Sequence, residues 1–134
     1  MMLENRSDNF NFCRITLEHT GAGGVMLDDN TARFYTLIVP LDGHGRINLS
    51  AWRARPKACH VIRTLSDKQE HTGLLTHCDD GMWRFVYDVA GLEDDEFGMR
   101  TIEQRVLPGA FVSVKTDDEL HAYKVQNCEP LHRE

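Results

Sequence analysis

The sequence contains no apolar run long enough to cross a membrane as a helix. Its longest apolar stretch, from Thr36 to Leu41, has the length of a strand, whereas a membrane-spanning helix needs about 20 apolar residues. The N-terminus also lacks the apolar stretch of a secretory signal, because charged residues begin at Glu4. We therefore expect a cytoplasmic protein that does not bind membranes.

The sequence also lacks the common motifs of catalysis and metal binding. It has no HExxH, CxxC, HxH or GxSxG motif and no phosphate-binding loop. Its cysteines are too far apart for a zinc knuckle or a redox pair, and each lies in or beside an apolar run, so we expect reduced, buried thiols. No catalytic residue, metal or cofactor is predicted. The cysteines are Cys13, Cys59, Cys78 and Cys128.

Proline is scarce, and no repeat or low-complexity segment divides the chain. A length of 134 residues leaves room for one hydrophobic core. Hydrophobic residues make up 41% and charged residues 27% of the chain, which is typical of a soluble globular protein. We expect a single domain over residues 1–134, with a disordered N-terminal tail at 1–9 and a frayed C-terminus at 129–134.

Alternation of apolar and polar residues predicts a mainly β fold. It is clearest where Cys13, Ile15 and Leu17 alternate with polar residues. Residues 46–54 show the same pattern and are expected to form a strand after a turn at 42–45. We predict a single-domain barrel or curled antiparallel sheet of seven or eight strands with at most one helix.

Two segments fit either a helix or a strand. Residues 56–65 have apolar positions compatible with both periods, and the density of β-branched residues favours a strand. Residues 96–107 follow an acidic loop, and acidic residues suit the N-terminus of a helix. The alternative fold is therefore an α+β barrel in which 56–70 and 94–106 are helical.

The clearest local motif is a hairpin around Asp79-Asp80-Gly81. A three-residue loop that ends in glycine is typical of tight β-hairpins, and it pairs residue 78 with residue 82 and aligns the residues on either side. Five large side chains then share one face, and we expect them to form the main aromatic core. They are Leu75, His77, Trp83, Phe85 and Tyr87.

A second hairpin is predicted near the C-terminus, with strands at 111–116 and 120–127 around residues 117–119. The phrase Pro108 to Val114, with the returning Tyr123 to Val125, resembles the closing hairpin of SH3-like barrels. The resemblance covers a small part of the chain. Many functionally unrelated families share such barrels, so it implies an architecture and no activity.

Negative charge dominates the chain, but one segment has none. The formal net charge is −6, which argues against nucleic acid as a partner. Residues 43–66 nevertheless carry five basic residues and no acid, whereas residues 67–104 carry ten acids and three bases. An extended chain would place residues 53, 55 and 57 on one side. We predict an anion-binding segment at 46–63 formed by Arg46, Trp52, Arg53, Arg55, Lys57 and Arg63.

These features predict a binding or protein-interaction module whose cationic segment contacts an anionic small molecule or an acidic protein surface. We expect a homodimer in which Arg53, Arg55 and Lys57 lie at or near the contact. The alternative function is a small enzyme with its site in a barrel cavity. The candidate residues for that cavity are His77, Trp83 and Tyr87.

Overall fold

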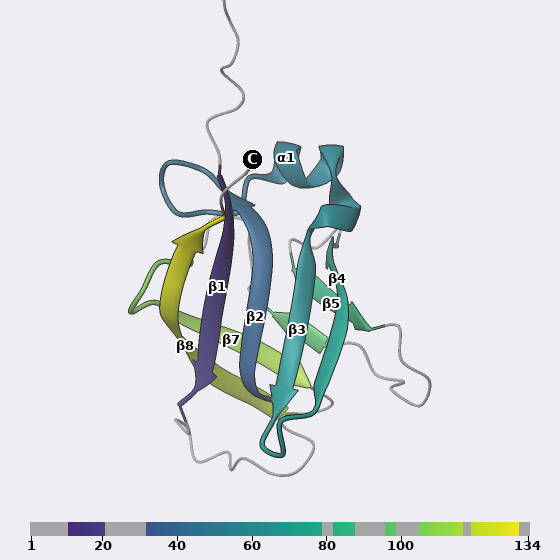
Figure 1. The fold of residues 1–134 in the computed structure, drawn as a ribbon, viewed down its shortest axis with the longest axis vertical. Coiled ribbons are helices and arrows are strands. Elements are labelled where there is room, and N and C mark those ends of the chain that lie inside the picture. Colours follow the sequence, from purple (N-terminus) through teal and green to yellow (C-terminus); the bar gives the residue numbers. More distant parts are fainter. Residues whose placement is uncertain are drawn as a thin grey trace, which may run out of the picture.

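The computed structural model describes residues 11–20, 32–78, 82–87, 96–98, 105–116 and 119–131. These segments form eight strands, one α-helix and one turn of 3-10 helix (Figure 1). The strands are β1 (Asn11–His19), β2 (Ala32–Leu41), β3 (His60–Leu65), β4 (Glu70–His77), β5 (Trp83–Tyr87), β6 (Glu96–Gly98), β7 (Phe111–Thr116) and β8 (Glu119–Pro130). The helices are α1 (Leu49–Ala54) and the 3-10 turn Pro56–Ala58.

Each strand pairs antiparallel with the next strand along the chain, and β8 pairs with β1 to close a barrel. The predicted mainly β architecture is confirmed. The α+β alternative is wrong for the residues described, because 60–65 and 96–98 are strands. Residues 99–104 lie outside the described segments. The β-branched side chains of β3 pack well on a pleated surface, which explains why 60–65 is extended.

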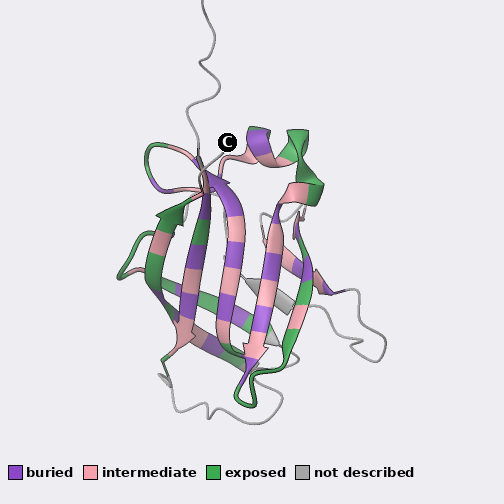
Figure 2. Ribbon diagram, in the orientation of Figure 1, coloured by how far each residue is buried: buried purple, intermediate pink, exposed green. Residues whose placement is uncertain are grey.

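The inner wall of the barrel follows the alternation of the sequence. Buried and less buried residues alternate along β1, β2 and β3 (Figure 2). Three aromatic rings from different walls meet inside: the Tyr35 ring centroid lies 5.2 Å from that of Phe85 and 4.9 Å from that of Tyr123. All three side chains are fully buried. Side chains therefore fill the barrel at the height of these three rings.

The central hairpin has the predicted register. Leu75 pairs with Phe85 and His77 with Trp83, and the backbone N–H of Cys78 donates to the carbonyl of Met82 at 2.8 Å. Trp83 and Phe85 are fully buried, so the aromatic face of this hairpin belongs to the core. Its loop, residues 79–81, lies outside the described segments.

The segment after β2 is helical, so the expected strand at 46–54 is wrong. Asn48 caps α1, because its side-chain oxygen accepts a hydrogen bond from the backbone N–H of Ala51 at 3.0 Å. Trp52 then points toward the barrel, where its Nε1–H donates to the carbonyl of Leu75 at 2.8 Å. The helix and the 3-10 turn thus lie over one end of the barrel (Figure 1). No helix in the described segments is both long and apolar enough to cross a membrane.

The C-terminal hairpin is present, but its loop and its second strand differ from expectation. Thr116 pairs with Glu119, so the loop comprises residues 117–118 rather than 117–119. Strand β8 continues to Pro130, and the N–H of Leu131 donates to the carbonyl of Phe12 at 2.8 Å. Pairing with β1 therefore holds residues 129–131, while 132–134 and the N-terminal tail lie outside the described segments. The SH3-like phrase is part of an eight-stranded meander.

Candidate functional site

Three of the predicted cations lie together on the element that covers the barrel end. Arg53 is in the last turn of α1, Arg55 follows that helix, and Lys57 is in the 3-10 turn. All three are exposed, and none makes an ion pair with the residues that the structure describes. Because the segment is helical, the three cations do not line one side of an extended chain. We call Arg53, Arg55 and Lys57 the cationic cap.

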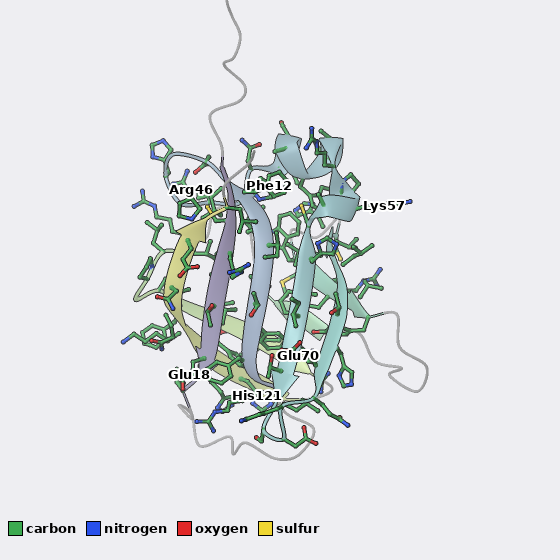
Figure 3. The ribbon with its side chains drawn as sticks, viewed as in Figure 1. Phe12, Glu18, Arg46, Lys57, Glu70 and His121 are labelled. Carbon is green, nitrogen blue, oxygen red and sulfur yellow. The ribbon has the colours of Figure 1, made fainter. Side chains whose placement is uncertain are left out.

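Arg46 lies at the same end of the barrel but apart from the cationic cap. Figure 3 shows Arg46 and Lys57 on opposite sides of this end. Arg46 follows a tight turn in which the Asp42 carboxylate accepts from the backbone N–H groups of His44 at 2.8 Å and of Arg46 at 3.0 Å. These two hydrogen bonds to the Asp42 carboxylate stabilise the turn. The turn places Arg46 away from the other cations.

Trp52 packs inward instead of joining the exposed cations. Its ring lies 5.6 Å from the Trp83 ring and 6.1 Å from the His77 ring, and the rings of His77 and Trp83 are 4.7 Å apart. The structure therefore brings together two of the three candidate cavity residues, beneath α1. The Nε2 atom of His77 and the Nε1 atom of Trp83 are buried and have no hydrogen-bond partner in the described part of the chain.

Tyr87, the third candidate cavity residue, lies elsewhere. It pairs with Gly73, whereas His77 pairs with Trp83, four residues along the same ladder. A separation of four residues along a strand is about 13 Å. His77 and Tyr87 share an inner wall but are too far apart to act on one reacting atom.

The last predicted cation, Arg63, is inside the barrel at the end opposite α1. Only 5% of Arg63 is exposed, and its guanidinium carbon lies 5.8 Å from the centroid of the Tyr87 ring. Its neighbours across the ladders are Tyr35 on β2 and His71 on β4. The predicted anion-binding segment is thus divided between an exposed cap and a buried position.

Two further histidines, which our sequence analysis did not single out, lie at the Arg63 end. His121 is 1% exposed, and its Nδ1 is 3.0 Å from the Nε2 of His19. The His19 ring also meets the Tyr123 ring edge-on at 5.2 Å. Burial, and the neighbouring His121, hold the pKa of His19 below its ordinary value. The signal was present in the sequence, because residues 19, 63 and 121 continue the inward alternation of their strands.

The four cysteines are free thiols. Cys13 and Cys59 are buried, as predicted, and Cys78 and Cys128 are half-buried. Burial raises the pKa of the Cys59 thiol to about 11, and burial together with the nearby Cys128 does the same for Cys13. A thiol is nucleophilic only as the thiolate, so neither is an active nucleophile at neutral pH. Within the described segments, no three His, Cys, Asp or Glu side chains are grouped as a metal ion requires.

Comparison with known proteins adds no assignment, since no family model, curated protein or solved structure matches the chain.

Proposed function

We propose that this protein is a binding module whose cationic cap docks on an acidic protein surface. The observation that carries the proposal is the exposure of Arg53, Arg55 and Lys57 on one short helical unit. That unit lies in a segment, 43–66, that has no acidic residue. Adjacent exposed cations repel one another, and an anionic partner relieves this repulsion.

The packing of the interior favours binding over catalysis. The rings of Tyr35, Phe85 and Tyr123 fill the middle of the barrel, whereas a small-molecule enzyme needs a concave site with converging polar groups. The residues of the alternative enzyme site support this view, because His77 and Tyr87 are four residues apart along their ladder. The enzyme remains the second hypothesis.

A second copy of this chain is the acidic partner that we propose. Residues 67–104 carry ten acids and three bases. The acidic side chains of that segment that the structure describes, Asp67 and Glu70, are exposed. Figure 3 shows Glu70 at the barrel end opposite Lys57. Asp67 and Glu70 therefore do not neutralise the cap within one chain, and both are accessible to another copy.

Light scattering across a salt series tests the proposal. At low ionic strength the particle should have about twice the chain mass of 15.3 kDa, and added salt should dissociate it, because screening weakens exposed charge pairs. The double variant Arg53→Glu/Arg55→Glu should be a monomer under the same conditions. A matched control, Arg33→Glu/Lys115→Glu, makes the same change in net charge at exposed positions outside the cap and should remain dimeric.

A polyglutamate column distinguishes self-association from another acidic partner. A monomer that binds polyglutamate through Arg53 and Arg55 would support docking on an acidic surface and reject the second copy as the partner. The proposal would be overturned if the protein were a monomer at low ionic strength and did not bind polyglutamate. It would also be overturned if polyglutamate binding were unchanged in Arg53→Glu/Arg55→Glu.

A further inference from the structure

Two cysteines lie next to each other at the seam where β1 and β8 close the barrel. The ladder between these strands pairs Cys13 with Pro130 and Ile15 with Cys128, so Cys13 and Cys128 are diagonal neighbours. Residues two apart along a strand lie on the same face of the sheet. Cys13 is buried in the core, and Cys128 packs against that core. Both thiols are therefore on the inner side of the seam.

The two thiols are in contact. Cys13 and Cys128 are hydrogen-bonded to each other through their side chains, and both are free thiols. The Cys59 thiol, by contrast, donates to the backbone carbonyl of Arg55 at 3.7 Å. Two thiols in contact on paired strands are the arrangement from which a disulfide forms by thiol–disulfide exchange.

The seam can adjust at this position, because both cysteines are close to the ends of their strands. Cys13 is near the start of β1 and Cys128 is near the end of β8. Figure 3 shows Phe12, the neighbour of Cys13, at the barrel end that carries α1. On the outer face, Arg14 and Glu129 form an ion pair at 3.8 Å between exposed side chains, and such a pair contributes little to stability. Backbone at strand ends opens more readily than backbone in the middle of a sheet.

The diagonal arrangement predicts a bond that is easily reduced. Diagonal neighbours in an antiparallel sheet are about 7–8 Å apart, whereas a disulfide spans Cα separations of up to about 7 Å. Forming the bond therefore draws the ends of β1 and β8 slightly together. Strained disulfides are reduced more readily than permanent structural ones, so this bond suits reversible oxidation.

We propose that Cys13 and Cys128 form a reversible disulfide that locks the seam between β1 and β8 when the chain meets a small disulfide of the glutathione type. This redox site is independent of the cationic cap. Neither cysteine belongs to the cap, and forming the bond leaves the charge of the cap unchanged.

The exchange takes place in two steps. The thiol of Cys128, which is half-buried whereas Cys13 is buried, loses its proton and attacks one sulfur of glutathione disulfide. The S–S bond of glutathione disulfide breaks, and one glutathione leaves as a thiolate. Cys13 then loses its proton and attacks the Sγ of Cys128, which releases the second glutathione thiolate. The two protons pass through solvent to the released thiolates, so two protein thiols are oxidised and one glutathione disulfide is reduced to two glutathiones.

The first step should be slow at neutral pH. Burial raises the pKa of the Cys128 thiol, although the hydrogen bond with Cys13 offsets part of this rise, and only the thiolate attacks. The second step is intramolecular, so the contact between the two side chains compensates for the small thiolate fraction of Cys13.

Equilibration of the full chain in glutathione buffers at mildly alkaline pH tests the site. After acid quenching and alkylation of the free thiols, peptide mass spectrometry should find a peptide that links Cys13 to Cys128. Its fraction should rise with the ratio of oxidised to reduced glutathione. The oxidised chain should melt about 5–15 °C above the reduced chain, because a crosslink between residues far apart in the sequence restricts the unfolded state. Dithiothreitol should reverse both changes.

Variants identify the pair. Cys13→Ala and Cys128→Ser should each abolish the linked peptide and the shift in melting temperature. If Cys13→Ala does not fold, Cys128→Ser carries the test, because Cys128 is only half-buried. Cys78→Ser is the matched control, since it makes the same change at another half-buried cysteine and should leave both readouts unchanged.

The proposal fails if Cys13 and Cys128 stay unlinked at the most oxidising glutathione ratio, or if the linkage joins other cysteines or two copies of the chain. Glutathione that remains attached to Cys128 would also overturn it, because Cys13 would then not complete the second step. A linked chain with an unchanged melting temperature would refute the locking of the seam, and a linkage that resists dithiothreitol in the folded chain would refute its reversibility.

Discussion

Replacing Trp83 with alanine tests the idea that the central hairpin anchors the core. Trp83 is fully buried, and its ring lies edge-on to two others, His77 at 4.7 Å and Trp52 at 5.6 Å. The substitution removes most of a large apolar side chain and leaves a cavity that the aromatic neighbours cannot fill. The expected loss in the free energy of unfolding is about 3–5 kcal/mol.

Part of that loss should be recovered by phenylalanine at the same position. Trp83→Phe keeps an aromatic ring against His77 and Trp52, and it removes the Nε1–H, which has no hydrogen-bond partner in the described segments. A buried donor without an acceptor is unfavourable, so removing it offsets some of the lost apolar contact. We expect a cost of roughly 1 kcal/mol for Trp83→Phe.

Urea denaturation followed by far-ultraviolet circular dichroism measures both variants. The chain has two tryptophans, and they are the two that touch here, so a fluorescence change would mix spectral and stability effects. For a domain of this size, the alanine variant should melt roughly 10–20 °C below the parent protein. A loss below about 1 kcal/mol would place the ring at the surface and contradict the core described above.

Three further predictions follow from individual contacts. Tyr123→Phe should cost about 1–2 kcal/mol in urea denaturation, because the buried Tyr123 hydroxyl donates to the carbonyl of Ala32 at 2.7 Å; an unchanged midpoint would show that this bond contributes nothing. Gly73→Ala should cost at least about 1–3 kcal/mol, because a Cβ at residue 73 would overlap the Val86 carbonyl, whereas Gly43→Ala, with open space around it, should be nearly neutral. Stability should decline as the pH falls below about 6.5, since burial keeps the folded-state pKa of His19 below that ordinary value, and the unfolded chain therefore binds the proton more readily; the decline should be shallower in His19→Asn, and an equal slope would show that His19 does not contribute.

The strands could be predicted from the sequence because each has one face in the core. Alternation marked Cys13, Ile15 and Leu17 on β1, and the turn at residues 79–81 set the register of Leu75 with Phe85. A one-residue slip would have turned the aromatic face toward solvent. The strong pattern of a half-buried strand thus determines both its existence and its pairing.

The cap could not be predicted in the same way. Residues 49–54 alternate well enough for a strand, and the helix depends on Asn48 as its N-cap and on Trp52 docking at the barrel end. The second condition is a tertiary contact with Leu75, 23 residues away in the chain, and local propensity does not contain it. Because this segment is helical and not extended, Arg53, Arg55 and Lys57 lie together in the cationic cap.

Arg63, His19 and His121 were missed as inward residues because polar residues at inward positions do not stand out in one sequence. Arg63 was grouped with the cations of its own segment, although Val61 and Leu65 on either side of it mark an inward position. His121 precedes Tyr123 and Val125 in the same manner on β8. Which inward positions meet at one end depends on the pairing of β1 with β8 and on the stagger of the closed barrel, and both emerge only from the assembled sheet.

One nuclear magnetic resonance experiment on the full chain tests the central proposal, because it can observe the cationic cap separately from the rest of the surface. Backbone and side-chain resonances would be followed while polyglutamate is added. The account predicts that polyglutamate shifts residues 53–57 and leaves the exposed Arg33 and Lys115 unshifted. Shifts spread evenly over the surface, or none in residues 53–57, would contradict it.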